Sequence, residues 1–219
     1  MASDRPEILP SAISSYIAER TGQPDDVLTA LAARTEALGR AARMQIGADQ
    51  GALLTLLTRL VGARQAVEVG TFTGFSSICI ARGLQPGGHL LCCDVSEEYT
   101  AIAREAWADA GLTDVIELRL APASDTLRAL PHEATIDLAF IDADKGGYAT
   151  YYSELLPRLR TGGIILVDNT LWSGRVVDDS ADDDDTVAIR AFNDLIAADD
   201  RVDSYILPIG DGVTLIRKR

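Results

Sequence analysis

The feature that most constrains the fold is an alternation of short apolar runs with helix-like stretches through the middle of the chain. The runs expected to form strands are Ala66–Val69, His89–Cys93, Val115–Leu120, Ile136–Ile141 and Ile164–Val167. Helices are expected between them, at about 75–83, 97–110, 123–130 and 147–159. Because strands covered on one face alternate apolar with polar residues, uninterrupted apolar runs indicate strands buried on both faces. The sequence therefore predicts an α/β fold with a doubly wound, mostly parallel sheet.

Both ends of the chain depart from this alternation. Residues 1 to about 62 have leucines at helical spacing and end at Gly62, a residue suited to a helix C-terminal cap. After a helix expected near 185–198, the runs SYILPI and VTLIRK are joined through Asp211-Gly212, which is typical of a hairpin. The last strand should therefore be antiparallel to the others. The 219 residues contain no linker or repeat, which favours a single domain over 1–219, with a helical cap at 1–62 and an α/β core at 63–219.

The charge of the chain is strongly acidic and unevenly distributed. Its 20 Lys and Arg residues and 33 Asp and Glu residues give a formal net charge of −13. Nucleic acids and anionic membranes carry negative charge themselves, so neither is expected as a partner. Most of the excess lies in residues 178–211, where eleven Asp and two Arg leave only −4 for the rest of the chain. The tract DDSADDDD at 178–185 favours a solvated loop or a helix N-terminus.

The cysteines and the N-terminal residues suggest a reducing compartment. Cys79, Cys92 and Cys93 have neither CxxC spacing nor a histidine at a matching distance, so we expect buried free thiols rather than a zinc site or disulfides. Cys92 and Cys93 are neighbours on one expected strand and should point to opposite faces. MASDRPEILP lacks the apolar region of a signal peptide, and no window approaches 18 apolar residues. These features predict a cytoplasmic protein.

A glycine-containing turn follows the first expected strand, in VEVGTFTGFSS at 67–77. Gly70 and Gly74 allow a tight turn and a close approach of a ligand to the backbone before a helix begins. Their spacing is not GxGxxG and no GK[ST] follows, which disfavours a nicotinamide oxidoreductase or a P-loop. Asp94 ends the next strand, where a carboxylate can accept hydrogen bonds from ribose, and Glu68 should face the same crevice. The pattern predicts a nucleoside ligand without a phosphate chain; an ordinary turn with Asp94 as a helix cap is the structural alternative.

Oxygen donors follow two further strands. FIDADKGGY at 140–148 places Asp142, Asp144 and Lys145 after one strand, and LVDNTLW at 166–172 places Asp168 and Asn169 after another. Ligands bind at the carboxyl edge of an open α/β sheet. Asp142, Asp168 and Asn169 are hard donors that suit Mg²⁺ or Ca²⁺. The alternative is that these acids cap helices or form ion pairs with Lys145.

Taken together, the motifs resemble those of the cation-dependent catechol and caffeoyl-CoA type O-methyltransferases, which use S-adenosylmethionine. The resemblance runs from Met44 to the last strand. The segments that carry it are MQIGADQG at 44–51, VEVGTFTGFSS, CDVSEE at 93–98, FIDADKGGY, DNTLWSG at 168–174, and FNDLIAADDR with LPIGDGVTLIRK at the end. It implies a Rossmann-like methyltransferase fold with a seven-stranded sheet, and a homodimer.

The resemblance also implies a role for individual residues. Asp142, Asp168 and Asn169 match the metal ligands, with Mg²⁺ expected and Ca²⁺ or Mn²⁺ as alternatives. The implied S-adenosylmethionine positions are Met44, Glu68, Gly70, Ser76, Asp94, Ala123, Asp142 and Asp144. Lys145 matches the lysine proposed as general base, although an ion pair with its aspartates is the alternative. Trp172 could form a wall for the acceptor ring or simply pack beneath the next loop. Ala121-Pro122-Ala123 departs from the family's usual Gly-Pro-Ala.

The expected activity is methyl transfer from S-adenosylmethionine to one hydroxyl of a vicinal aromatic diol, because two adjacent oxygens can complete the shell of an open cation site. The alternatives are a hydroxycinnamoyl-CoA ester or a non-aromatic hydroxyl as acceptor, and a non-catalytic nucleoside-binding protein. Plant members of the family have a long Arg-containing loop after the position of Trp172, where this chain has DDSADDDD. That tract should repel a CoA ester, so we expect a neutral or cationic catechol.

Overall fold

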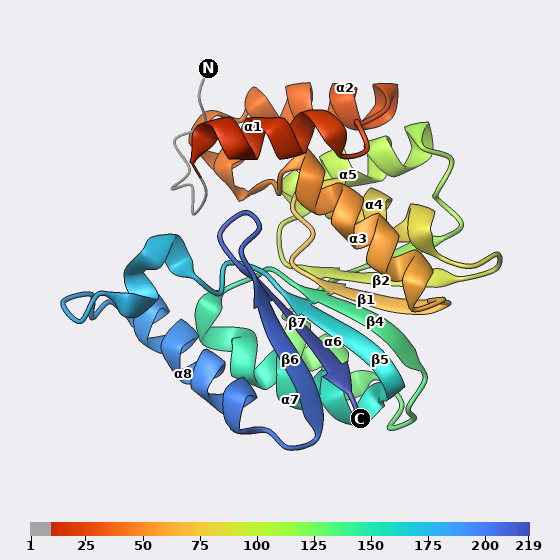
Figure 1. The fold of residues 1–219 in the computed structure, drawn as a ribbon. Helices are drawn as coiled ribbons and strands as arrows, with labels where there is room; N and C mark the ends of the chain where they lie inside the picture. Colours follow the sequence, from red (N-terminus) through yellow and green to blue (C-terminus); the bar gives the residue numbers. More distant parts are fainter. Residues whose placement is uncertain (1–9) are drawn as a thin grey trace.

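A seven-stranded sheet lies between two layers of helices in the computed structural model, which describes residues 10–219 (Figure 1). The strands are β1 (Gln65–Val69), β2 (His89–Asp94), β3 (Ile116–Leu120), β4 (Ile136–Ile141), β5 (Leu159–Val167), β6 (Val202–Leu207) and β7 (Val213–Lys218). Their order is β3-β2-β1-β4-β5-β7-β6, and β7 alone is antiparallel to its neighbours. The predicted doubly wound α/β fold and the antiparallel last strand are confirmed.

The helices form as the sequence predicts, with small shifts at their ends. Those of the core are α4 (Phe75–Gly83), α5 (Glu97–Asp109), α6 (Ala123–Ala129), η2 (Lys145–Gly147), α7 (Tyr148–Arg158), η3 (Trp172–Val177) and α8 (Asp184–Ala198). β5 begins five residues earlier than expected. Arg158 is the last residue of α7, so the chain passes directly into Leu159, which pairs with Ile136 before a register shift.

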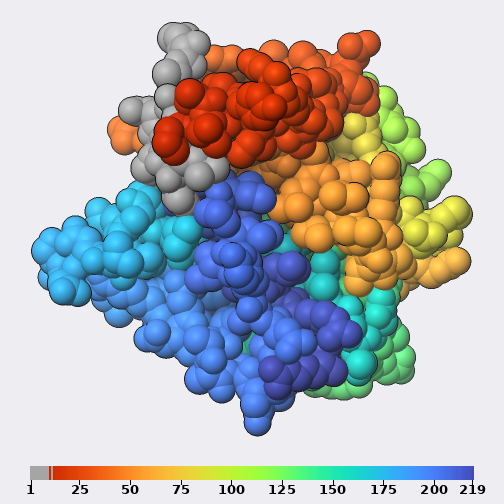
Figure 2. All heavy atoms as spheres, viewed as in Figure 1, coloured from red at the N-terminus to blue at the C-terminus, as the bar shows by residue number. Residues whose placement is uncertain are grey.

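The N-terminal residues add a group of helices on the α4 side of the sheet, where α3 packs against α4. It consists of α1 (Ser11–Arg20), α2 (Asp26–Glu36), η1 (Gly39–Met44) and α3 (Ala48–Leu60). Gly62 has φ +65° and follows α3 as expected of a C-terminal cap. In the space-filling view the blue β6–β7 turn lies against the orange α3 (Figure 2). The helices expected before residue 62 are thus confirmed from Ser11 onward, while residues 1–9 lie outside the described part of the chain.

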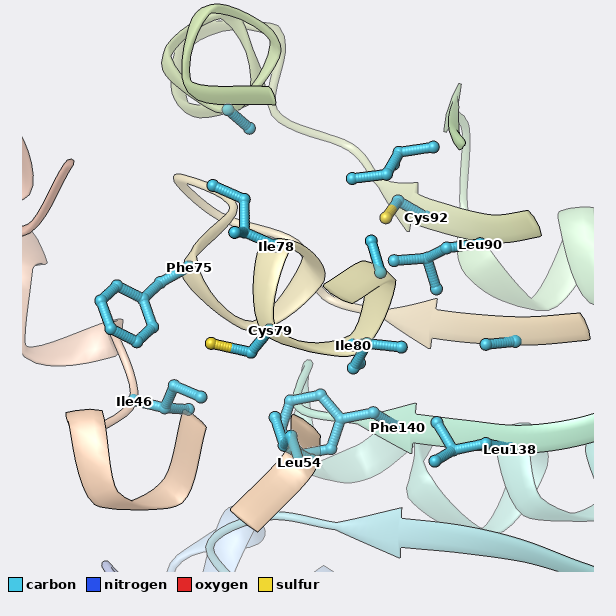
Figure 3. Close-up of a cluster of buried hydrophobic side chains, with 14 of the residues drawn as sticks. Ile46, Leu54, Phe75, Ile78, Cys79, Ile80, Leu90, Cys92, Leu138 and Phe140 are labelled. Carbon is cyan, nitrogen blue, oxygen red and sulfur yellow. The ribbon is translucent and has the colours of Figure 1, made fainter. Parts of the chain in front are cut away.

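The core has two halves, one on each face of the sheet. Leu90, Cys92, Leu138 and Phe140 pack beneath α3 and α4, with Leu54, Phe75, Ile78 and Ile80 around them (Figure 3). On the opposite face the alternate residues pack against α7 and α8; among them are Val67, Leu91, Cys93, Ala139 and Ile165. Coverage of both faces explains the uninterrupted apolar runs. All three cysteines are buried and free, and Cys92 and Cys93 belong to different halves of the core, as expected.

No helix within residues 10–219 is both long enough and apolar enough to span a bilayer.

Candidate active site

The carboxyl ends of β1, β2, β4 and β5 open into a cleft of about 1840 Å³, which residues of α1, η1 and α3 also line. Small-molecule sites commonly occupy 300–1,000 Å³, so this cleft has room for two ligands side by side. Most of the residues predicted from the sequence line it: Met44, Gly70, Ser76, Asp94, Ala123, Asp142, Asp144, Lys145, Asp168, Asn169 and Trp172. The topology brings these residues together because β1 and β4 are neighbours at the point where the order of the strands reverses.

The turn between β1 and α4 requires both of its glycines. Gly70 and Gly74 each have φ +88°, in the left-handed region that residues with a Cβ avoid. A Cβ on Gly70 would overlap the backbone carbonyl oxygen of Asp142, and one on Gly74 would lie 2.8 Å from the Cβ of Ala103. The turn therefore presses against β4 on one side and α5 on the other, and it brings its backbone to the edge of the cleft.

Asp94 organises this turn through its carboxylate. Its Oδ2 accepts the backbone N–H groups of Thr71 and Phe72 at 2.8 and 2.9 Å. Its Oδ1 accepts those of Val95 and Ser96 at 2.7 and 2.8 Å. An ionised carboxylate has about four acceptor positions, and the backbone uses four here. Asp94 thus holds the β1–α4 turn and the start of its own loop, whereas the cap of α5 is Ser96, which accepts the N–H of Tyr99; a contact of Asp94 with ribose stays a prediction.

Glu68 does not face the cleft, and the sequence-based expectation that it would is wrong. Side chains alternate along β1, so Glu68 points to the same face as its strand partner Cys92, whose thiol lies 3.3 Å from Oε2. The carboxyl is fully buried. Burial raises the pKa of Glu68 to about 8, against the opposing effect of hydrogen bonding from Ser76 and Cys92. Glu68 therefore lies behind the turn rather than on its ligand side.

Lys145 is the centre of the polar cluster on the other side of the cleft. Its Nζ donates to Asn169 Oδ1 at 2.7 Å, to the Tyr148 hydroxyl at 2.7 Å and to Asp142 Oδ1 at 3.3 Å. The Tyr148 hydroxyl in turn donates to the backbone carbonyl of Asp168 at 2.9 Å. The side-chain oxygens of Asp142 and Asn169 thus both contact the Lys145 ammonium group. The contact with Asp142 is the ion pair that was considered for Lys145.

The ionised form of Asp168 is disfavoured by its surroundings in the protein. The residue is 3% exposed, and its Oδ1 accepts the backbone N–H of Asn169 at 2.8 Å. Burial raises the pKa of Asp168 to about 7, and the nearby charge of Asp142 acts in the same direction; Gln50 and Lys145 act against it. A pair of carboxylates with one shared lysine leaves negative charge for a further cation to balance.

This donor set fits a hard divalent cation. Asp142 and Asp168 supply carboxylate oxygens and Asn169 an amide oxygen, all from the ends of β4 and β5. Within residues 10–219, no three His, Cys, Asp or Glu side chains form a group that could hold a metal. A cation here would therefore depend on the Asn169 carbonyl oxygen, and on water or a ligand for its other positions.

Trp172 borders the cleft beside this cluster. Its ring centroid lies 5.5 Å from Lys145 Nζ. Asn169, Trp172 and Ser173 all have positive φ, between 45° and 58°, which is uncommon for residues with a side chain. Asp211 holds this backbone, because its carbonyl oxygen accepts the N–H of Leu171 at 3.0 Å and its carboxylate accepts that of Ser173 at 2.5 Å. The position suits a wall for an aromatic ligand, and that role stays a prediction.

Several residues of the site were not identified from the sequence. Tyr148 packs on Phe192, and its hydroxyl also joins Lys145 to the backbone carbonyl of Asp168. Tyr151 donates to Asp144 at 2.5 Å. Gln50 lines the cleft from α3. The spacing of Tyr148, three residues after Lys145, was a usable signal; nothing in the sequence pattern distinguished Gln50.

The aspartate tract at 178–185 lies outside the cleft lining. The repulsion of a CoA ester that was expected from this tract stays a prediction. Asp183 caps α8 by accepting the N–H of Thr186 at 3.1 Å, and hydrogen bonds from Thr186, with Arg175, lower its pKa to about 2. Arg190 donates to four backbone carbonyls of residues 175–181 and holds the loop against α8. Besides Lys145, the basic residues that line the cleft are Arg40, Arg43, Arg59 and Arg82.

Comparison with known proteins gives consistent matches over nearly the whole chain. A model of the O-methyltransferase family matches residues 18–219. "Probable caffeoyl-CoA O-methyltransferase 2" of Dictyostelium discoideum is 42% identical over 212 residues, which cover 95% of this chain and 92% of that protein.

Among solved structures, the O-methyltransferase from Bacillus cereus in complex with SAH has a TM-score of 0.86 and 32% identity, covering 95% of this chain and 97% of its own. TomG from Streptomyces achromogenes, involved in tomaymycin synthesis and solved with SAM, has a TM-score of 0.86 and 29% identity, covering 94% and 96%.

Proposed function

This chain belongs to the O-methyltransferase family and is an S-adenosylmethionine-dependent enzyme, and from that premise we propose that it methylates one hydroxyl of a catechol-type aromatic diol with the help of a divalent cation. The observation that carries the proposal is the convergence of the Asp142 and Asn169 side-chain oxygens on Lys145, with Asp168 lining the same cleft, at the same edge of the sheet as the glycine turn. The proposed acceptor is a small molecule, and the proposed cation is Mg²⁺, with Ca²⁺ or Mn²⁺ as alternatives.

The methyl donor would occupy the β1–β2 side of the cleft. There the backbone of the Gly70 turn, the end of β2 at Asp94 and the start of α6 at Ala123 form one continuous wall. Transfer breaks the bond between the methyl carbon and the sulfonium sulfur, forms a bond to the acceptor oxygen and releases that oxygen's proton. Oxygen, carbon and sulfur must be in line at short distance, so the two sides of the cleft have to hold their ligands rigidly.

The cation would be held by Asp142, Asp168 and Asn169. When bound, a divalent cation lowers the pKa of a hydroxyl by stabilising its oxyanion, and its unfilled positions suit two adjacent oxygens. Tyr148 links Asp168 to Lys145 through its hydroxyl. The hydroxyl donates to the backbone carbonyl of Asp168 and accepts a hydrogen bond from the ammonium group of Lys145. Burial raises the pKa of Tyr148 well above its usual range, which keeps it a neutral hydrogen-bond donor.

Lys145 is the proposed proton acceptor for the acceptor hydroxyl. It is 9% exposed, lines the cleft and lies next to Trp172, so it is within the space that an aromatic acceptor would fill. Its contacts with Asp142 and Asn169 describe the ammonium form. Accepting a proton requires the neutral amine, whose free electron pair would face the acceptor hydroxyl.

Replacement of Asp142 by alanine tests this mechanism. With a catechol acceptor and Mg²⁺, Asp142→Ala should lower kcat/KM by about 100-fold or more, because it removes a charged group that orients the reacting centre. Asp179→Ala is the matched control, since Asp179 is exposed and lies outside the cleft lining. Methyl transfer by the wild-type enzyme should also stop in excess chelator. Full activity of Asp142→Ala, or of chelated wild type, would refute the cation-dependent proposal.

A hydroxycinnamoyl-CoA ester is the second candidate acceptor. The observation in its favour is the row of arginines along the cleft, Arg40, Arg43, Arg59 and Arg82, together with the caffeoyl-CoA names of the Dictyostelium relatives. Competition between caffeoyl-CoA and a small catechol separates the two candidates. If Arg40→Ala weakens use of the CoA ester but not of the catechol, the ester is the acceptor that the arginines recognise.

A further inference from the structure

Tyr151 is a buried residue of the cleft to which the proposed function assigns no role. It belongs to α7 and is 7% exposed, and it lines the cleft together with Asp144, the residue before η2. Its hydroxyl donates to Asp144 Oδ1 at 2.5 Å, a short hydrogen bond of the kind that a charged acceptor forms. Within residues 10–219 the Asp144 carboxylate has no further hydrogen bond or ion pair, so its second oxygen is available to a ligand.

Gly147 makes room for this arrangement. Its φ of −82° and ψ of −17° are ordinary for any residue, so the backbone does not require a glycine there. A Cβ at this position would instead lie 2.5 Å from two carbons of the Tyr151 ring and 2.6 Å from its hydroxyl oxygen. A Cβ on the neighbouring Gly146 would meet nothing within 4 Å. The glycine at 147 therefore leaves space for the Tyr151 hydroxyl beside Asp144.

The tyrosine and its carboxylate partner lie on the side of the cleft assigned above to the methyl donor. The glycine turn contacts the backbone next to the carboxylate, because a Cβ on Gly70 would lie 3.2 Å from the Cα of Ala143. Tyr151 belongs to the buried cluster that contains Cys93 of β2, and Ala123 at the start of α6 packs against the same cluster. The carboxylate is thus placed next to the wall that faces the donor.

We propose that Tyr151 is a positioning residue that holds the Asp144 carboxylate toward the methyl donor, where it accepts a hydrogen bond from S-adenosylmethionine. The inference rests on the proposed function only in its methyl donor, and not in its cation or acceptor. The donor molecule carries an ammonium group, ribose hydroxyls and an adenine amino group, each of which can donate to a carboxylate. Burial and the hydrogen bond to Asp144 raise the pKa of Tyr151 well above its usual range, so its hydroxyl stays protonated and can donate.

Titration calorimetry with S-adenosylhomocysteine tests this inference without acceptor, cation or turnover. Tyr151→Phe keeps the ring and removes the hydroxyl. We expect its Kd to rise about fivefold, because the carboxylate must then be ordered when the ligand binds. Tyr152→Phe is the matched control on the same helix. Tyr152 is also buried, but it donates at 2.8 Å to Asp199, outside the cleft lining, so this variant should bind like wild type.

The two adjacent glycines test the same contact from the other side. Gly147→Ala would push against the Tyr151 ring and move its hydroxyl, so it should also weaken binding of S-adenosylhomocysteine. Gly146→Ala has open space around the added Cβ and should bind like wild type. Equal affinity in the two glycine variants would contradict the inference.

A double-mutant cycle distinguishes positioning from a purely structural role. If Tyr151 acts through Asp144, Tyr151→Phe should cause no further loss of affinity in an Asp144→Ala background. A structural role would give additive losses, and that result would overturn the inference. Because the cycle compares variants that share the same second change, it also decides the question if Tyr151→Phe lowers the stability of α7.

The same titrations with 5′-methylthioadenosine identify which part of the donor molecule the carboxylate contacts. This compound keeps the nucleoside and lacks the amino-acid group. A similar weakening by Tyr151→Phe for both ligands would assign the contact to the nucleoside, whereas a weakening with S-adenosylhomocysteine alone would assign it to the ammonium group.

The outcomes separate this inference from the proposed function. Activity that survives chelation, or a catechol that is not methylated, would refute the proposed cation or acceptor and leave the role of Tyr151 intact. Wild type that binds S-adenosylhomocysteine, with Tyr151→Phe binding equally well, would overturn the role of Tyr151 alone. Equal losses in Tyr151→Phe and Tyr152→Phe would also overturn it, because they would show that only the packing of α7 matters.

Discussion

At the scale of single residues, the buried ionisable groups differ in whether they have a partner of opposite charge. Arg158 is fully buried yet well satisfied, since it donates to Glu154 and to the carbonyl of Leu130. Glu68 is equally buried but forms no ion pair with any residue between 10 and 219, and it lies behind the turn that faces the cleft. A paired buried charge leaves stability nearly independent of pH near neutrality, whereas an unpaired carboxyl links folding to proton binding.

Glu68 should make the stability of the protein fall as pH rises from about 5 to 8. Its folded-state pKa of about 8 lies above the ordinary value of 4.5, so the folded protein keeps a proton in this range that the unfolded chain has lost. The stabilisation is complete below the ordinary pKa and is lost as pH approaches 8, with a slope of at most about 1.4 kcal/mol per pH unit. Denaturant unfolding of wild type and Glu68→Gln at several pH values measures it.

The two unfolding curves should converge at low pH and separate at high pH, with the variant less sensitive to pH. The elevated pKa of Asp168 affects both proteins alike, so the difference between them isolates Glu68. Curves that run parallel from pH 5 to 8 would contradict the assignment. Glu98→Gln, on the exposed face of α5, is the control that should match wild type.

At the scale of elements, the β1–α4 turn connects the two halves of the site. Its glycines contact β4 and α5, and Asp94 at the end of β2 holds its N–H groups. The position of the backbone proposed to face the methyl donor therefore depends on three strands and two helices at once. Such a turn tolerates little change, because neighbouring backbone cannot move aside as a flexible side chain can.

Gly70→Ala should be far more damaging than Gly87→Ala. Both glycines have positive φ, but a Cβ on Gly70 would overlap the Asp142 carbonyl, whereas one on Gly87 meets nothing within 4 Å. We expect Gly87→Ala to cost about 1–2 kcal/mol of stability, from backbone strain alone. Gly70→Ala should cost about 4 kcal/mol or more and abolish S-adenosylmethionine binding.

Thermal unfolding and calorimetry with S-adenosylhomocysteine would compare the two glycine variants. Similar losses of stability in both would mean that the conformation of the turn matters and its contact with β4 does not.

At the scale of the whole molecule, the net charge of −13 is concentrated away from the cleft. Within residues 178–185, Asp183 caps α8 and Asp178 accepts a hydrogen bond from Ser180, while arginines and the acids proposed to hold a cation line the cleft. Overall charge is therefore a poor guide to the acceptor in this protein. The homodimer implied by the family resemblance stays a prediction, which sedimentation velocity would test.

Replacing three of the tract's aspartates should leave catalysis nearly unchanged. Asp182, Asp184 and Asp185 are exposed and outside the cleft lining, whereas Asp183 caps α8 and is kept. A triple change to serine raises the net charge by three, and we expect kcat/KM for a small catechol and for caffeoyl-CoA to stay within about twofold, because surface charge at a distance is screened by salt. A selective gain of activity with caffeoyl-CoA would instead support the repulsion of the CoA ester that the sequence predicts.

Residue types and their order were sufficient for most of the fold and for most of the residues that line the cleft. Uninterrupted apolar runs determined strands buried on both faces, Asp211-Gly212 determined the final hairpin, and acids following two strands placed Asp142, Asp168 and Asn169 at one edge. These properties are local or follow from the topology of parallel sheets, so the sequence alone determines them.

Only the tertiary structure decided which way individual side chains point and what meets them from distant segments. The pleat of β1 turned Glu68 away from the cleft, the packing of α3 brought Gln50 into the cleft lining, and Arg190 held the acidic loop outside the site. Each outcome depends on contacts between segments far apart in the sequence, and no local pattern records such contacts. Their physical basis is the close packing of the core, where burial and the available partners decide whether a polar group serves the site or the fold.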